Sequence, residues 1–441
     1  MKAKSTAAVA GDVMPRSDPL TFEARTYAKV GRRLIPFLML CYLGAYLDRV
    51  NVGFAKLQML NDLRFSETVY GMGAGIFFLG YFLFEVPSNV ILHRVGARRW
   101  LARIMLTWAV ISASFVFVRS PTAFYVLRFL LGVAEAGFAP GVILYLTYWF
   151  PAERRAKALS LFFMAIPLAG IIGGPLSGAI MHSLHGAWSM SGWKWLFLLE
   201  AVPSLVLGIA ILLYLDDGIA KAKWLTDAEK TLLARNVASD AQQTVTHVSI
   251  REFVRDRRLW LMATIYFCVV LGQYGLTFWL PTIIRKAGVA DPLWIGVFTA
   301  IPYLCAIVTL PLVGMSADRH RERRFHLAIP MLVAAAGFAT LPLLGSVGAS
   351  IVCLSVASAG ILASSSQFWS LPTALLGGMS AAAGIAAVNC FANLAGFFSP
   401  AIVGWLNDLT GKSTAGLIFI SVAVTLGALL VFRVPAQSVN R

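Results

Sequence analysis

Charged side chains interrupt the long apolar stretches in the first half of this sequence, namely Asp48, Arg49, Glu85, Arg128, Glu135 and Glu200. A charge near the middle of a membrane span costs about 2.5–3.5 kcal/mol on insertion scales, so it normally has a partner and a function. The apolar stretches of the second half contain no such residue. We therefore expect the chemistry to reside in the first half.

Arg128 and Glu135 are seven residues apart. In a helix this spacing returns to one face, about 10 Å further along. With Asp48 and Arg49 they would place two Arg and two carboxyl groups on one cavity. An arriving carboxylate could then bind an Arg, because a guanidinium grips carboxylates bidentately, and a freed acidic group could bind a proton. The alternative is a static buried ion-pair network that holds the first and fourth spans together.

Glu85 and Glu200 are expected elsewhere. Glu85 lies near the cytoplasmic end of the second span, where it would pair with a loop arginine such as Arg94 or Arg98. Glu200 is expected in the same cytoplasmic-half network and has no assigned role.

Several uncharged side chains are candidates for the wall of a substrate cavity. Arg49 and Arg128 would bind the substrate together with Tyr46, Tyr81, Gln273, Tyr274, Trp369, Asn389 and Asn393. Asp48 and Glu135 would couple the proton. Interfacial aromatic belts and hydrogen bonds between helices are the alternative explanations for the uncharged residues. Gly174 and Pro175 lie in a glycine-rich fifth span, which we expect to flex and take part in gating.

The elements that must position these residues are membrane-spanning helices. The chain has 441 residues, of which 58% are hydrophobic and only 13% charged. Stretches of about 20 apolar residues can cross a bilayer, and in lipid they must be helical. We predict twelve: 34–54, 69–92, 100–118, 122–145, 157–181, 195–215, 259–283, 294–317, 326–345, 349–376, 380–403 and 413–433.

The basic residues predict the orientation of these spans. The formal charge of +16 would suggest nucleic-acid binding in a soluble protein, but here Lys and Arg concentrate in alternate loops. If both termini are cytoplasmic, the outer loops hold only Lys56, Arg64, Arg119, Lys194, Arg285, Lys286 and Lys412. The positive-inside rule therefore predicts cytoplasmic termini and no nucleic-acid partner.

The domain organisation follows from the grouping of the spans into six and six. A cytoplasmic N-terminal tail (1–32) would precede a six-helix lobe (33–215), a cytoplasmic linker (216–258), a second six-helix lobe (259–433) and a cytoplasmic tail (434–441). The linker contains two capping-box patterns, Thr226 with Glu229 and Ser249 with Glu252. They predict two short helices, the second at Ile250–Arg258.

Short matches at nearly one spacing suggest that the halves are repeats. Ser88–Arg99 and Val313–Arg324 both carry an Arg at the seventh position and end in Arg-Arg. Leu43–Tyr46 and Leu271–Tyr274 also correspond, which gives Tyr46 and Tyr274 equivalent places in the two halves.

Other kinds of function lack support in the sequence. The five cysteines lie in predicted spans without metal-ligand spacing and suit apolar packing. We find no phosphate loop, nucleophile elbow or metal motif, so we expect neither enzymatic activity, nor a cofactor, nor a metal.

At these residues the sequence resembles the major facilitator superfamily, from about residue 30 to 435. Gly314, Asp318, Arg319 and the Arg323-Arg324 pair look like its inter-helix signature, which implies gating roles for Arg94, Arg98, Asp318 and Arg319. The stretches Tyr46–Asn51, Phe84–Asn89 and Arg128–Gly141 resemble its anion:cation symporter branch, which includes tartrate, phthalate, hydroxyphenylacetate and sugar-acid permeases. That resemblance ties Asp48, Arg49, Arg128 and Glu135 to carboxylate binding and proton coupling.

Two positions depart from the family pattern. His93 stands where the inter-helix signature usually has Asp, and the fifth span contains no Asn or Gln, an amide that sugar-acid carriers place there. The second departure favours tartrate or a small aromatic acid over a polyhydroxylated substrate.

We therefore expect a monomeric, proton-coupled symporter of an organic anion in the bacterial inner membrane, working by alternating access. The alternatives are a sugar-acid symporter, a carboxylate exporter of the same fold or, in a different class, a transport-like membrane sensor.

Overall fold

A computed structural model describes residues 19–242, 256–375 and 380–439 of the chain. These residues are helical, with no strand among them, and they contain twelve helical segments long and apolar enough to cross a membrane. The predicted all-helical fold with twelve spans is thereby confirmed.

The first six spans form one lobe. Several of them are built from two helices in series, because the backbone breaks within the span. The helices are α1 (Pro19–Val50), α2 (Val52–Leu63), α3 (Glu67–Val95), α4 (Ala97–Ala113) with η1 (Ser114–Phe117), α5 (Pro121–Glu135), α6 (Phe138–Thr147), α7 (Ala152–Phe163), α8 (Ala165–Ser183), η2 (Ala187–Ser189) and α9 (Gly192–Tyr214).

The last six spans form the second lobe, and short helices at its edge follow α15 and α19. The helices are α12 (Arg257–Lys286), α13 (Pro292–His320), α14 (Arg324–Thr340) with η4 (Leu341–Leu343), α15 (Val347–Phe368), α16 (Ser370–Leu375), α17 (Ser380–Asn393), α18 (Ala395–Thr410), α19 (Thr414–Val431) and α20 (Ala436–Val439).

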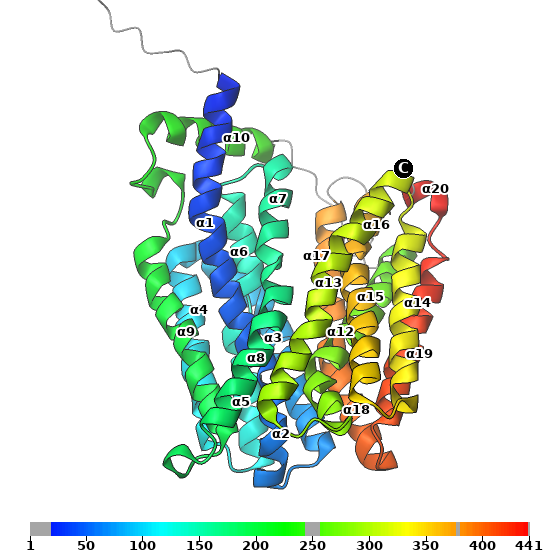
Figure 1. The fold of residues 1–441 in the computed structure, drawn as a ribbon. Coiled ribbons are helices and arrows are strands. Elements are labelled where there is room, and N and C mark those ends of the chain that lie inside the picture. The colour runs from blue at the N-terminus through cyan, green and yellow to red at the C-terminus, as the bar shows by residue number, and fades with distance from the viewer. Residues whose placement is uncertain (1–18, 243–255, 376–379, 440–441) are drawn as a thin grey trace, which may run out of the picture.

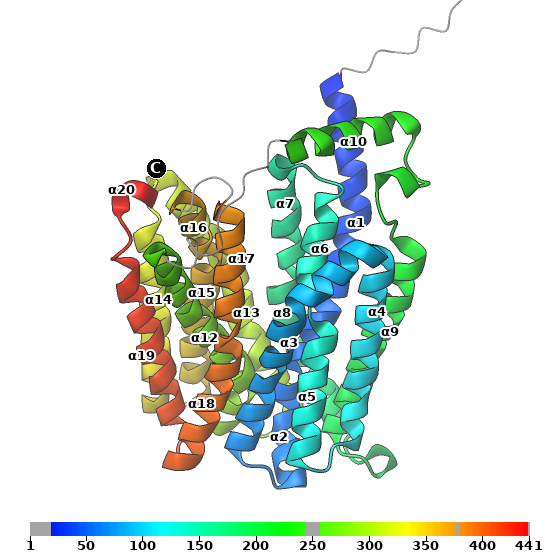
Figure 2. The same cartoon turned by 180° about the vertical axis from the view of Figure 1, so that it is seen from behind.

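The two lobes converge at one end of the molecule and diverge toward the end that carries the connecting helix α10 (Figures 1 and 2). We call these ends the far side and the α10 side. Helix α8 packs on α13, and α3 packs on α18. Glycines permit both crossings: a Cβ on Gly174 would lie 2.1 Å from Thr299 Oγ1, and one on Gly71 would lie 2.2 Å from the Pro400 carbonyl oxygen.

The breaks in the first and fourth spans fall beside the charged residues. Helix α1 ends at Val50, just after Asp48 and Arg49. Helix α5 ends at Glu135, and the chain then turns through Gly137, whose φ is +86°. A side chain there would be strained and its Cβ would lie 2.3 Å from Ser88 Oγ. Arg49 and Glu135 thus lie in the last turns of α1 and α5.

The segment between the lobes contains η3 (Ile219–Lys221) and α10 (Asp227–Gln242). The predicted capping box forms: Glu229 N donates to Thr226 Oγ1 at 3.3 Å, and Thr226 N donates to Glu229 Oε2 at 2.8 Å. Burial raises the pKa of Glu229, but hydrogen bonds from Lys29 and Thr226 outweigh it and leave that pKa below its ordinary value. The predicted helix Ile250–Arg258 falls mainly outside the described residues.

Candidate functional site: a buried charge cluster in the first lobe

Arg49 and Glu135 form a buried ion pair between the first and fourth spans. Arg49 Nε donates to Glu135 Oε1 at 3.0 Å, and its Nη2 donates to the same oxygen. Both residues are at most 7% exposed. Each residue lies in the last turn of its helix, Arg49 in α1 and Glu135 in α5. The structure thus gives Glu135 a different partner from the Arg128 with which it shares a helix face.

Aromatic rings surround the Arg49 guanidinium. Its Cζ lies 5.3 Å from the ring centres of Phe77 and Tyr81 and 5.9 Å from that of Tyr46. Tyr274 of the second lobe faces the same guanidinium. Cation–π attraction is strongest where water is excluded, so this cage stabilises the cation and also offers flat apolar surfaces beside it.

Arg128 is fully buried and is held without a carboxylate. Its Nε donates to the Gly73 carbonyl at 3.1 Å and its Nη2 to the Ala74 carbonyl at 3.2 Å, both on α3. Its Nη1 has no hydrogen-bond partner among the described residues. Its Cζ lies 5.0 Å from the Phe77 ring centre. One ring therefore lies within reach of both arginines, and Arg128 retains a free donor.

Asp48 points away from the arginines, between α4 and α9. Its Oδ1 accepts from Ser112 Oγ at 2.8 Å and its Oδ2 from Ser204 Oγ at 2.6 Å. The four charged residues thus divide into one ion pair, one arginine on backbone carbonyls and one acid on serine hydroxyls.

Glu200 corrects an expectation. Instead of joining Glu85 in a cytoplasmic-half network, it is buried near the Asp48 end of the cluster, where its Oε1 accepts from Ser177 Oγ of α8 at 2.6 Å. The guanidinium of Arg98, one of the expected partners of Glu85, donates instead to the Leu212 carbonyl.

Tyr46, Tyr81, Gln273 and Tyr274 lie around the cluster. Tyr46, on α1, faces Gln273 and Thr277 of α12. The Tyr274 ring packs on Phe78 of the first lobe, with 4.4 Å between ring centres. These contacts cover the Arg49–Glu135 pair from the second lobe.

Trp369, Asn389 and Asn393 are placed differently. Trp369 packs on Tyr266, 4.7 Å between ring centres, and Tyr266 precedes Tyr274 by two helical turns, about 12 Å along α12. Asn389 and Asn393 are half-buried on α17, which packs against α12. No hydrogen bond joins either amide to the charged cluster among the described residues.

The residues with expected gating roles lie on the α10 side. The backbone N–H of Arg98 donates to Asp217 Oδ1 at 3.2 Å, within the first lobe. Asp318 forms an ion pair with Arg323 at 2.9 Å, within the second lobe. Arg94 and Arg319 are exposed at the ends of α3 and α13. Gly174 and Pro175 lie instead in α8, at its crossing with α13.

The far side is closed by polar contacts between the lobes. Asp408 of α18 accepts from the backbone N–H groups of Glu67 at 3.1 Å and Thr68 at 2.7 Å, at the start of α3. Tyr70 donates to the Phe278 carbonyl at 2.9 Å. Lys56, paired with Glu67, lies 3.4 Å from the ring centre of Trp279. Because a helix N-terminus favours a carboxylate, Asp408 stabilises this closure.

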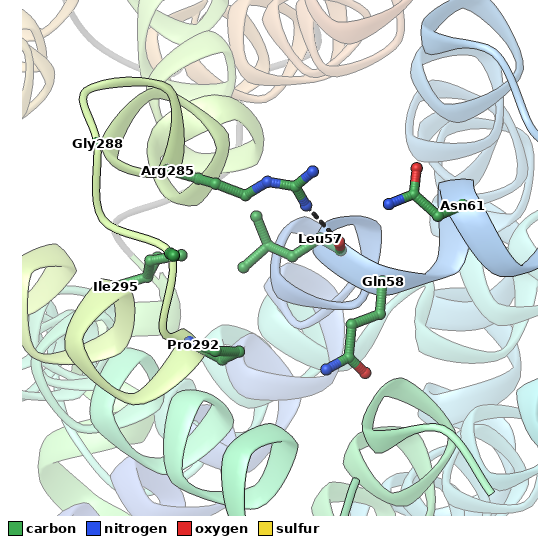
Figure 3. Close-up of a pocket in the computed structure, with 8 residues that line it drawn as sticks. Leu57, Gln58, Asn61, Arg285, Gly288, Pro292 and Ile295 are labelled. Atoms are coloured by element: carbon green, nitrogen blue, oxygen red, sulfur yellow. Dashed lines mark hydrogen bonds between the residues drawn. The ribbon is translucent and has the colours of Figure 1, made fainter. Parts of the chain in front are cut away.

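A surface cavity of about 540 Å³ marks the outer edge of this seam. Figure 3 shows Arg285 of α12 reaching across it to donate to the Leu57 carbonyl of α2, with Gln58 and Asn61 on the opposite wall. The cavity is separate from the charged cluster and lies on the closed side.

Some residues of the site escaped sequence reasoning. Phe77 is one apolar residue among many in its span, and Ser112 and Ser204 give no signal of pairing with an acid. Asp408 could have been noticed as an acid near a span end. Among the described residues, no group of three or more His, Cys, Asp or Glu side chains could hold a metal ion.

Comparison with known proteins agrees with this architecture. The family model described as Major Facilitator Superfamily matches residues 38–400. The chain is 48% identical to a candidate metabolite transport protein, NicT, of Pseudomonas putida, over 94% of this chain and 95% of that one. It is 47% identical to a candidate tartrate transporter of Agrobacterium vitis, over 92% and 91%. A quinolone resistance transporter of Acinetobacter baumannii is 40% identical, over 95% and 96%.

Among solved structures, a bacterial homologue of the human lysosomal transporter Spinster, in an inward-facing and occupied conformation, superposes with a TM-score of 0.74. The match covers 94% of this chain and 98% of that one at 16% identity, so it bears on the fold alone. The expected family is confirmed, and the relatives are transporters and not enzymes. With its twelve spans in two lobes and the family match over most of its length, this chain belongs to the major facilitator superfamily of membrane transporters.

Proposed function

We propose that the protein is a proton-coupled symporter that imports a small organic carboxylate, either tartrate or an aromatic acid such as phthalate or hydroxyphenylacetate. The observation that carries the proposal is the buried Arg49–Glu135 pair. Breaking a buried pair by removing one partner costs roughly 3–5 kcal/mol, because it leaves a charge uncompensated. A substrate carboxylate that replaces Glu135 on Arg49 avoids this cost.

The displaced Glu135 is the proton acceptor in this scheme. A carboxylate buried without a cation is strongly disfavoured, so Glu135 would bind a proton once it loses Arg49. Substrate and proton then bind together and leave together. Asp48, held by two serine hydroxyls, would tune this exchange as a second protonatable group.

Arg128 and the aromatic cage supply the remaining contacts. The unpartnered Nη1 of Arg128 can donate to a second oxygen of the substrate. Phe77, Tyr81 and Tyr274 offer flat faces to an aromatic acid, and the tyrosine hydroxyls can bind the hydroxyl groups of tartrate. The Agrobacterium relative supports tartrate. Trp369, Asn389 and Asn393 would contact the substrate only when α12 and α17 move.

We infer that the protein lies in the bacterial inner membrane as a monomer, with both termini and α10 in the cytoplasm. The positive-inside distribution of Lys and Arg supports this orientation. The far side would then face outward, and the divergence of the lobes toward α10 would represent an inward-facing state. Closure on the cytoplasmic side would bring Arg94, Arg98, Asp318 and Arg319 together, with α8 flexing at Gly174 and Pro175.

The second candidate is an exporter of the same fold, which the quinolone resistance transporter favours. A sugar-acid importer is less well supported, because the fifth span offers no amide. A sensor would not need Glu135 to bind a proton when the substrate replaces it on Arg49. An importer and an exporter differ from each other in the direction of net transport.

The test begins with thermal shifts of the purified protein against a panel of carboxylic acids and fluoroquinolones. A compound that stabilises the protein is then offered to proteoliposomes with an acidic exterior. We expect a carboxylate to accumulate inside and a protonophore to abolish accumulation. Binding without any transport would indicate a sensor. Stabilisation by fluoroquinolones alone, with proton-driven extrusion from cells, would establish the exporter instead.

A further inference from the structure

Glu200 is the buried acid that the proposed exchange leaves unused. It is 2% exposed on α9, and one oxygen accepts from Ser177 Oγ at 2.6 Å. The other oxygen, Oε2, is buried without a hydrogen-bond partner among the described residues. None of the ion pairs of the described residues includes Glu200. An ionised carboxylate in this position would carry a buried and uncompensated charge, which costs several kcal/mol.

A second unpartnered group faces it. Asn51 is 1% exposed, and within the described part of the chain neither its Oδ1 nor its Nδ2 has a hydrogen-bond partner. Asp48 and Asn51 follow one another by three residues, and Glu200 and Ser204 by four, so each pair shares a helix face. Ser204 Oγ donates to Asp48 Oδ2, which sets the two faces opposite one another and brings Asn51 beside Glu200.

The protonation states follow from the donors and acceptors. Asp48 accepts one serine hydroxyl on each oxygen, a pattern that suits an ionised carboxylate. Glu200 has only one such contact. A proton on Glu200 Oε2 would create a donor that the Asn51 oxygen can accept, and this hydrogen bond would satisfy two of the three unpartnered atoms.

The charged groups of the helices around α9 do not compensate an ionised Glu200. Helix α9 packs on α1, α2, α4 and α8, and the charged groups of these helices have other partners or lie at their ends. Arg49 pairs with Glu135, Lys56 with Glu67, His182 with Asp291 and Asp62 with the Trp193 indole, while Arg98, Arg99 and Arg103 begin α4 on the α10 side. Of the charged groups that the structure describes, Asp48 is the one that Glu200 approaches.

We propose that Glu200 is a proton-binding site, occupied in the empty carrier and throughout the transport cycle, with Asn51 as the acceptor of its O–H. The buried cluster then holds two cations, Arg49 and Arg128, and two anions, Asp48 and Glu135. With Glu200 neutral, these five groups carry no net charge. As a consequence, which rests on the proposed function, one added substrate carboxylate requires one added proton.

Infrared difference spectroscopy of the purified protein at neutral pH tests the protonation state directly. The wild-type spectrum minus that of Glu200→Gln should contain the carbonyl band of one protonated carboxylic acid, shifted in D₂O. Loss of carboxylate bands instead would overturn the proposal. Asp62→Asn is the matched control, and it should remove carboxylate bands. In Asn51→Leu the acid band should move, since its O–H loses the acceptor, and an unmoved band would refute the Asn51 contact.

Proton uptake on substrate binding tests whether the proton stays. Hydroxyphenylacetate, or whichever acid stabilises the protein, is added to a weakly buffered detergent solution while the pH is recorded. Glu200→Gln should take up as many protons per bound substrate as the wild type. Fewer protons would show that the Glu200 proton moves, which would overturn permanent occupancy. No uptake in the wild type would contradict the proposed symport and leave the infrared result to stand on its own.

Discussion

Arg49 and Arg128 are both buried, but their charges are compensated in different ways. Arg49 is held by the Glu135 carboxylate, whereas Arg128 donates to two backbone carbonyls of α3 and keeps Nη1 unpartnered. Carbonyl dipoles stabilise a cation without neutralising it, so Arg128 remains attractive to an anion. In the proposed mechanism the two residues would therefore have separable roles: Arg49 would exchange partners and Arg128 would add a contact.

Replacement of Arg128 by Lys tests this added contact. Lysine keeps the charge but loses the planar fork that reaches two carbonyls and a substrate oxygen at once. We expect substrate binding to weaken by about 2–5 kcal/mol, the usual cost of losing a buried charge-assisted contact. Calorimetry on purified protein measures it. Arg103→Lys, at a half-exposed site over the Trp100 ring, is the control and should bind normally.

Wild-type affinity in a well-folded Arg128→Lys protein would assign Arg128 a purely structural role.

At this scale the sequence predicted the kinds of residues but not their pairing. Asp48, Arg49, Arg128 and Glu135 stood out because a charge in an apolar span is costly. Helical periodicity placed Arg128 and Glu135 on one stripe, yet Glu135 pairs with Arg49. Arg128 and Glu135 do share the continuous helix α5, but periodicity along one helix does not predict the partner that another helix supplies.

Among the elements, the broken helices matter most for the site. Hydropathy recognises the fourth span as a continuous apolar stretch, because the turn at Gly137 changes backbone geometry and not polarity. Gly137 in the left-handed region carries the turn after Glu135. The contacts that close the far side join residues more than two hundred positions apart, such as Tyr70 and Phe278, and no local pattern could predict them.

Substitution of Gly137 by Ala tests the break. A residue with a side chain costs about 1–2 kcal/mol in the left-handed conformation, and this Cβ would also press on Ser88 Oγ. We expect a lower midpoint of thermal unfolding and impaired transport. Gly186→Ala is the matched control, since Gly186 has φ +84° but nothing within 4 Å of its Cβ. Equal effects of the two substitutions would show that the contact with Ser88 is unimportant.

The far-side closure is testable through Asp408, which caps α3 from the other lobe. Asp408→Ala should destabilise the closed far side by roughly 0.5–2 kcal/mol, the usual cost of losing a cap. Distances between spin labels at Arg64 and Lys412, in a background without native cysteines, should then show more of a long-distance population. Asp62→Ala removes an acid whose partner, Trp193, lies in the same lobe, and it should leave the distances unchanged. An unaltered distribution in Asp408→Ala would mean that other contacts hold the seam.

For the molecule as a whole, the two lobes share a fold but differ in the kinds of polar side chain that they bury. Among the residues that the structure describes, the buried arginines and acids belong to the first lobe, and the second contributes aromatic and amide side chains such as Tyr274 and Gln273. This division was visible in the sequence, as were the twelve spans and the family. The relative position of the lobes was not, because it depends on contacts between residues far apart in the sequence, such as Tyr70 and Phe278.

The orientation in the membrane can be checked at the C-terminus. Alkaline phosphatase fused after Val434 should be inactive, because the enzyme needs the oxidising exterior, and a fluorescent protein fused there should be bright. The same two fusions after Lys412 give the opposite pattern if α19 crosses the membrane. Active phosphatase after Val434 would reverse the assignment of the far side to the exterior.

The most direct measurement of the central claim compares two assays on Glu135→Gln. Glutamine resembles the protonated acid, so the variant should still bind substrate and exchange labelled for unlabelled substrate across proteoliposomes. It should not accumulate substrate when a proton gradient is the sole driving force, because no proton leaves to restore the Arg49–Glu135 pair. Exchange without accumulation is the result we predict. Accumulation against the substrate gradient by Glu135→Gln would contradict the exchange of partners on Arg49 and make Asp48 the next candidate for coupling.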